Sequence, residues 1–201
     1  MKIQPAVFFR ALSLSAALTL CLTSLLPGRA VNRASPAESI PKIARIAGIK
    51  VGYTTRERLE ACWGEGKTVV GGHSNGARLW RVKGTNWVIY ADAFEYEKNG
   101  IVVDSLDIST NQVNASDAPF VKVSAASLAW LGGVSLGMTE EKVLAVLLRK
   151  SLPVQPTSDG WTTSATGFHD LGNVNREKFQ SWTVRLDFEG KVLVGLSLDA
   201  R

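Results

Sequence analysis

The chain is poor in cysteine and histidine. Its 201 residues contain two of each, and the two histidines, His73 and His169, are far apart in the sequence. Zinc sites in proteins need several Cys, His or carboxylate ligands, usually at short and recognisable spacings. We therefore predict no metal and no cofactor. Only Cys62 lies outside the first thirty residues, so we also expect no disulfide within the processed chain, whose stability must come from its core.

The N-terminal apolar run is too short to span a membrane. Residues 11–26 make a run of sixteen, whereas a spanning helix needs about 20 residues. The run follows two basic residues and precedes Gly28-Arg29-Ala30, an arrangement typical of a secretory signal peptide that is cleaved after Ala30. We therefore predict that residues 1–30 are a signal peptide and that the protein is periplasmic or secreted.

Two alternatives place the protein at a membrane. An uncleaved signal would act as an anchor, and lipidation at Cys21 would produce a membrane-anchored lipoprotein. Lipoprotein signals have a small residue before the cysteine, whereas Leu20 is large, so the sequence favours the cleaved and unlipidated form.

Excess basic charge is small once the predicted signal peptide is removed. The full chain has 23 basic and 18 acidic residues, a net charge of +5. The first thirty residues carry three of the basic residues and no acidic one, which leaves a net charge of +2. No basic stripe of the kind found in nucleic-acid-binding proteins remains, so we expect no nucleic acid among the partners.

An internal repeat is the most informative pattern present. Residues 48–54 (GIKVGYT) recur as residues 133–139 (GVSLGMT), and each copy leads into a short amphipathic segment. Farther along, the strand pattern before Gly100 recurs before Gly190. A repeat on this scale indicates two copies of one supersecondary unit.

Each repeat predicts a short helix with a threonine N-cap. Thr54 has Glu57 three residues later, the capping-box spacing, and Gly64 ends that helix. In the second copy Thr139 is the predicted N-cap, and two glutamates follow it in the first turn, where the helix dipole favours negative charge.

Alternating apolar and polar residues predict a hairpin near the C-terminus. Residues 182–187 and 192–198 have the period of two that is typical of strands. A three-residue loop over residues 188–190, with Gly190 left-handed, would place Val184 and Val194 on one apolar face. We therefore predict this loop, accompanied by a bulge.

The earlier hairpin is predicted with a loop of the same length over residues 98–100. This register puts Asp92 and Asp104 on the apolar face. Two alternatives stay open: the aspartates form a carboxylate pair with a raised pKa, or a bulge near Ala91 turns one of them to solvent.

These elements predict an α+β fold of two tandem units, each with one or two short helices packed on a small antiparallel β-sheet. We expect five segments along the chain: a signal peptide (1–30), a flexible leader (31–47), the first helix-plus-sheet unit (48–108), a linker and lead-in (109–131) and the second helix-plus-sheet unit (132–201).

The second repeat resembles a known family. Gly137-Met138-Thr139, Val143 four residues later and the strand end Phe188-Glu189-Gly190-Lys191-Val192 are similar to the SmpA/OmlA-type envelope lipoproteins. Two such units in tandem resemble the architecture of β-lactamase inhibitory proteins. The resemblance implies helices laid on an antiparallel sheet, and a role in outer-membrane assembly or in enzyme inhibition.

A serine-hydrolase pattern is present but incomplete. Residues 72–76 (GHSNG) match the G-x-S-x-G elbow, which would make Ser74 the nucleophile and His169 its base. That elbow needs a helix after the serine, whereas residues 78–82 have a strand pattern. We therefore predict that the protein is not an enzyme and keep a small secreted serine hydrolase as the disfavoured alternative.

Tryptophans and arginines provide a candidate binding surface. Trp87 falls on the strand face opposite the main apolar set, and Trp80 lies nearby with Arg78 and Arg81. Together with His73 these residues form a predicted aromatic and basic patch of the composition enriched at protein interfaces. We predict an exported, non-enzymatic module that uses a sheet surface to bind a protein partner in the envelope or extracellular space; the alternative is a membrane-anchored assembly or structural factor.

The signal-peptide prediction is tested by the mass and N-terminal sequence of the exported protein. We expect a species that begins at residue 31, because the small residues before that position fit the cleavage site. A species that begins at Cys21 and carries added lipid mass would contradict this expectation and support the anchored lipoprotein.

Overall fold

The computed structural model describes residues 39–70, 77–96, 100–110, 115–170 and 178–201. The predicted signal peptide, Cys21, His73 and Ser74 lie outside these residues. Residues 35–201 form one compact unit.

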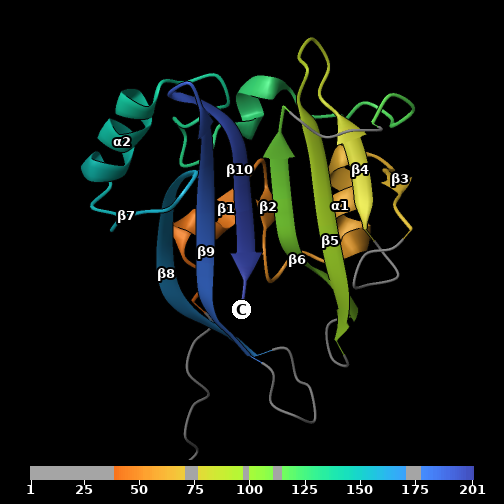
Figure 1. The fold of residues 1–201 in the computed structure, drawn as a ribbon. Helices are drawn as coiled ribbons and strands as arrows, with labels where there is room; N and C mark the ends of the chain where they lie inside the picture. Colours follow the sequence, from red (N-terminus) through yellow and green to blue (C-terminus); the bar gives the residue numbers. More distant parts are fainter. Residues whose placement is uncertain (1–38, 71–76, 97–99, 111–114, 171–177) are drawn as a thin grey trace, which may run out of the picture. The chain divides into compact units, whose positions relative to one another are not determined.

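Strands dominate the described residues (Figure 1). An antiparallel sheet of eight described strands has the order β3-β4-β5-β6-β10-β9-β8-β7, and a smaller sheet pairs β1 with β2. The strands are β1 (Arg45–Ile46), β2 (Ile49–Lys50), β3 (Lys67–Thr68), β4 (Arg78–Arg81), β5 (Val88–Tyr96), β6 (Gly100–Ser109), β7 (Gln155–Pro156), β8 (Gly160–Asp170), β9 (Lys178–Glu189) and β10 (Val192–Ala200). The helical elements are η1 (Lys42–Ala44), α1 (Arg56–Trp63), η2 (Ala125–Leu128) and α2 (Glu140–Arg149).

The predicted α+β fold of two tandem units is wrong. The hairpin strands of both predicted units belong to one sheet, because β6 pairs with β10 from Ser105–Asp199 to Ser109–Gly195. Separate sheets would have left both of these strands as edges with unpaired backbone groups, and their pairing removes both edges. The fold is therefore mostly β, and the described residues include two short α-helices.

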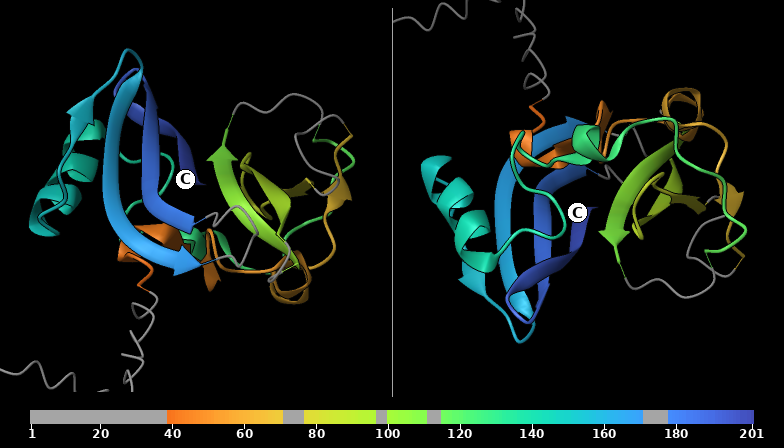
Figure 2. Two further views of the ribbon diagram at one scale, coloured as in Figure 1. Left: turned by 90° about the horizontal axis from the view of Figure 1, so that it is seen from below. Right: turned by 90° about the horizontal axis from the view of Figure 1, so that it is seen from above.

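One face of the large sheet carries the helical elements (Figure 2). α2 is tied to it by a hydrogen bond of 2.8 Å from the Trp161 indole of β8 to the Glu140 carboxylate. Isolated bridges join Thr55, just before α1, to Val102 of β6 and Thr139, just before α2, to Val192. Both helix starts are therefore attached to the sheet.

Buried tryptophans fix the layer beneath the sheet. Four of them are fully buried, and each donates its indole N–H to a backbone carbonyl. The bonds join Trp63 to Ala47 (3.2 Å), Trp80 to Gly64 (3.0 Å), Trp130 to Ile43 (2.8 Å) and Trp182 to Val51 (2.7 Å). Three of the acceptors lie between residues 43 and 51. The end of the predicted flexible leader is thus part of the core, with Ile43 and Ile46 buried.

The predicted loop of the C-terminal hairpin is wrong. β9 and β10 are joined by two residues, Gly190 and Lys191, both left-handed at φ 55° and 65°, as a tight hairpin turn requires. The register then shifts between Leu193 and Gly195, so Val194 is an extra residue on β10. The bulge, which was predicted, restores the apolar face by bringing Leu196 opposite Leu186.

The predicted bulge in the earlier hairpin is confirmed beside Ala91. The β5–β6 register shifts between Asp92 and Ala93, which leaves Asp104 as the extra residue on β6. The predicted loop position is one residue too late, because Tyr96 pairs with Gly100 across residues 97–99, which are themselves outside the described residues.

The predicted N-cap of α1 needs a correction of one residue. Thr55 is the N-cap, and its hydroxyl accepts a hydrogen bond of 3.3 Å from the Arg58 backbone N–H. Thr54 is buried, and its hydroxyl accepts from Lys50 N–H at 2.9 Å, inside the preceding turn. Thr139 is the N-cap of α2, although its side chain makes no capping hydrogen bond.

Loss of the Trp182 indole hydrogen bond should lower the free energy of unfolding measurably. We expect Trp182→Phe to cost about 1–3 kcal/mol, because the Val51 carbonyl is left buried without its donor. Trp182→Ala should cost about 3–5 kcal/mol, because it also leaves a cavity. Urea unfolding measures both, with the partly buried Trp87→Phe as control. A Trp182→Phe loss no larger than that of Trp87→Phe would contradict a structural role for the hydrogen bond.

Candidate functional site

The residues of the predicted aromatic and basic patch do not share one exposed surface. Trp80 is fully buried and packs edge-on against Trp63, with ring centroids 5.9 Å apart. Trp87 is partly buried and packs against the main core cluster rather than away from it. His73 lies outside the described residues.

The two arginines of that patch point to opposite sides of β4. Arg78 pairs with Glu60 of α1, Nε to Oε1 at 2.7 Å, on the helical side. Arg81 donates from Nε to the Ala118 carbonyl at 2.7 Å and stacks over the Phe120 ring at 4.4 Å. Both therefore tie β4 to neighbouring segments, and strand alternation separates them.

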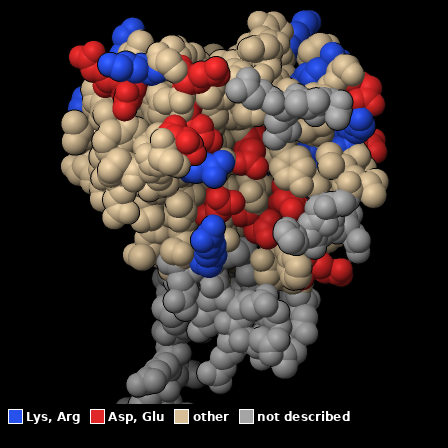
Figure 3. All heavy atoms as spheres, in the orientation of Figure 1, with Lys and Arg blue, Asp and Glu red and all other residues tan. Residues whose placement is uncertain are grey.

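A different surface gathers chemistry-bearing side chains. Five aspartates lie on the strands in the middle of the large sheet: Asp92 on β5, Asp104 and Asp107 on β6, Asp187 on β9 and Asp199 on β10. Figure 3 shows acidic side chains collected over the middle of the sheet face that is turned away from the helices. We call these five residues the acidic face.

Strand pairing and one bulge bring the acidic face together. Ser105 lies opposite both Asp92 and Asp199, and Asp107 lies opposite Ser197. Because the residues that alternate with these, such as Leu106, point into the core, the polar side chains share the other face. The bulge adds Asp104 to this group, close enough to the Asp92 carboxylate for the two to repel.

The acidic face is partly desolvated. Burial raises the pKa of Asp104 to about 6, and the neighbouring Asp92 carboxylate adds to the shift. Burial also raises the pKa of Asp107, although a hydrogen bond from Ser197 opposes this. The pKa of Tyr90 is raised by burial and then by the Asp92, Asp107 and Asp104 carboxylates. These carboxylates are therefore held together at an electrostatic cost.

One arginine contributes positive charge to this face. Arg185 of β9 is paired with Asp187, Nε to Oδ1 at 3.1 Å, and is itself exposed. It lies near enough to Asp107 to lower that carboxyl's pKa, although burial outweighs it. Negative charge therefore remains in excess on the acidic face.

The sequence identified only part of this surface. Asp92 and Asp104 were predicted as neighbours, and the structure has both the bulge and the raised pKa of Asp104 that had been treated as alternatives. Asp107, Asp187 and Asp199 were missed. Their proximity depends on the pairing of β6 with β10, for which the sequence has no local signal.

Of the two residues of the serine-hydrolase alternative, the structure describes only His169. His169 is buried, with its ring centroid 4.8 Å from that of Tyr53, while Ser74 is outside the described residues. The described part of the chain has no group of three or more His, Cys, Asp or Glu residues that could hold a metal ion. None of its helices is long and apolar enough to cross a membrane.

Comparison with known proteins found no matching family model, no matching curated protein and no matching solved structure. The resemblance to the SmpA/OmlA-type lipoproteins therefore stays a prediction.

Asp104 should make the protein more stable as the pH falls from neutral toward 4. Its pKa is about 6 in the fold against 3.8 for the ordinary carboxyl, so the fold binds the proton more tightly than the unfolded chain does. The destabilisation is therefore present above pH 6 and is relieved as the pH falls through the window between 6 and 3.8.

Urea unfolding at about pH 7.5 and about pH 5 tests this, because Asp104→Asn should stabilise the protein at the higher pH and reduce the difference between the two. Exposed Asp159→Asn, in the turn before β8, is the control. An Asp104→Asn variant with the wild-type pH dependence would show that this carboxyl does not titrate in the window.

Proposed function

We propose that this protein is a non-enzymatic binding module whose acidic face contacts a basic segment of a protein partner. The observation that supports it is the group of five aspartates on the sheet face away from the helices. The sequence predicted that a sheet surface binds the partner. We place this contact on the acidic face and not on the aromatic and basic patch.

Electrostatics favour a cationic partner. Partly buried carboxylates that repel one another are stabilised when an opposite charge approaches, as the raised pKa values of Asp104 and Asp107 indicate. A partner's Lys or Arg would provide that charge with hydrogen-bond donors, and complementary charge also speeds and orients association.

The short side chains on this face leave room for an extended segment of the partner. Between the aspartates lie short polar side chains, among them Ser105 and Ser197, whereas the bulky side chains of β6 and β10 point into the core. Long basic side chains can therefore reach the carboxylates without displacing core residues. Phe94, near the end of β5, is 43% exposed and offers an apolar contact beside the acidic face.

The proposed location follows from the predicted signal peptide. A chain processed after residue 30 would meet its partner in the periplasm or outside the cell. Anchorage through Cys21 or an uncleaved signal would instead place the same face near a membrane. In that case the alternative function is that of an envelope assembly or structural factor. Neither location requires catalysis by Ser74.

Capture from a cell-envelope extract tests the proposal. The double variant Asp107→Asn/Asp199→Asn removes two charges from the acidic face, and we expect it to retain less than about a tenth of the protein captured by the wild type. Capture should fall at about 0.5 M salt, because salt screens the attraction that brings oppositely charged surfaces together. Quantitative mass spectrometry of the bound fraction gives both values.

Glu65→Gln/Glu141→Gln is the control for lost negative charge, because it also removes two carboxylates, which are exposed and lie outside the acidic face. It should capture as much as the wild type. Equal capture by the wild type and the acidic-face variant, or equal loss in the control variant, would contradict a role for the acidic face.

A further inference from the structure

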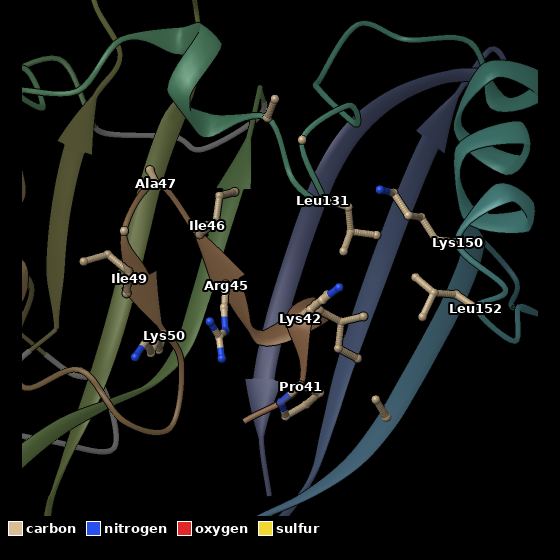
Figure 4. Close-up of a pocket in the computed structure, with 15 residues that line it drawn as sticks. Pro41, Lys42, Arg45, Ile46, Ala47, Ile49, Lys50, Leu131, Lys150 and Leu152 are labelled. Atoms are coloured by element: carbon tan, nitrogen blue, oxygen red, sulfur yellow. The ribbon is translucent and has the colours of Figure 1, made fainter. Parts of the chain in front are cut away.

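A cavity of about 720 Å³ lies on the helical side of the sheet, opposite the acidic face (Figure 4). Its walls come from η1 and the β1–β2 hairpin on one side and from the segments around Leu131 and the end of α2 on the other. Ala165 of β8 also contributes to the lining. Its volume lies within the range of small-molecule sites, about 300–1,000 Å³.

The charged residues that line this cavity are all cations. Lys42, Arg45, Lys50 and Lys150 belong to the lining, and no carboxylate is present among the described residues that form it. Lys42 and Lys150 are exposed and form no ion pair with any described residue. In Figure 4 their ammonium groups project from opposite walls into the same space.

Apolar side chains form the rest of the surface. Leu131 and Leu152 face the space between the two lysines in Figure 4, and Ile46 is part of the opposite wall. An ion as small as phosphate would leave this apolar area in contact with water. A ligand that covers the leucines and also carries one negative group satisfies both parts of the cavity.

The cavity is held in its shape by unusual backbone and by the buried tryptophans. Four non-glycine residues of the described chain are left-handed, and two of them, Ala47 (φ 45°) and Leu131 (φ 52°), line the cavity. A third, Ser151 (φ 54°), lies between the lining residues Lys150 and Leu152. Such strained residues gather at ligand sites, where the surrounding structure fixes them.

Indole hydrogen bonds support the same wall. Trp130 binds the Ile43 carbonyl and Trp63 binds the Ala47 carbonyl, both within the segment that lines the cavity. The wall is therefore anchored from the core side. A preformed site loses less conformational entropy when a ligand binds.

We propose that this cavity binds an amphipathic organic anion, with an apolar body against Leu131 and Leu152 and one carboxylate between Lys42 and Lys150. The site is separate from the acidic face, so its occupation and the capture of a basic partner are independent activities.

Isothermal titration calorimetry of the processed protein with sodium laurate, below its micellar concentration, tests the proposal. Dodecanol has a similar chain without charge, and dodecyltrimethylammonium has the opposite charge. We expect laurate to bind at least tenfold more tightly than dodecanol, and the cation to bind more weakly still. Equal affinity for the three amphiphiles, or no laurate binding, would overturn the proposal without using any variant.

Lysine variants then locate the site. Lys42→Gln/Lys150→Gln should weaken laurate at least tenfold and leave dodecanol unchanged, because both side chains are exposed and the fold does not depend on them. Lys83→Gln/Lys142→Gln removes two exposed lysines outside the cavity and should bind laurate like the wild type. An equal loss in both double variants would show that net charge, not this cavity, attracts the ligand. Both lysine double variants should capture as much partner protein from the envelope extract as the wild type does.

Discussion

Hydrogen bonds from buried indoles to the backbone of residues 43–51 are the constraint on which the fold most depends. This segment lies beneath the large sheet, and its short β1–β2 hairpin forms a sheet of its own rather than pairing with the strands of the large sheet. Its carbonyl groups would be costly to bury alone. Trp63, Trp130 and Trp182 satisfy three of them while filling the core with their rings. One residue type thus meets both the polar and the apolar needs of the layer.

The sheet also separates two kinds of charge. On one side, strand alternation and the Asp104 bulge collect carboxylates that repel one another. On the other, the anchored segment brings Lys42 and Arg45 to a cavity whose opposite wall carries Lys150. The described part of the chain therefore presents two surfaces of opposite sign, and each is the basis of one of the two proposed binding activities.

Local features were the part that the sequence could predict. The helix after Thr139, the turn glycines and the bulge beside Ala91 all follow from patterns within a few residues. Where two neighbouring residues or two turn lengths fit the same pattern, the prediction was wrong by one residue. The N-cap of α1 is Thr55 and not Thr54, and the last hairpin has a two-residue turn with its bulge inside β10.

Long-range pairing was beyond local patterns. Whether β6 and β10 pair or remain edges is decided by contacts across the whole chain, so a single sheet was mistaken for two. The acidic face was consequently seen only as the Asp92–Asp104 pair. Trp87 and Trp80 show the same limit, because strand alternation indicates two faces but not which elements cover each of them.

The indole bonds also bear on the order in which the molecule assembles. Trp182 lies 131 residues beyond its acceptor, and Trp130 lies 87 residues beyond its own. Residues 43–51 are synthesised before either tryptophan, so the Ile43 and Val51 carbonyls gain these donors only after β9 has been made. Closing such long loops costs entropy before any contact is gained. A segment that is made early is therefore held in place by side chains that are made late.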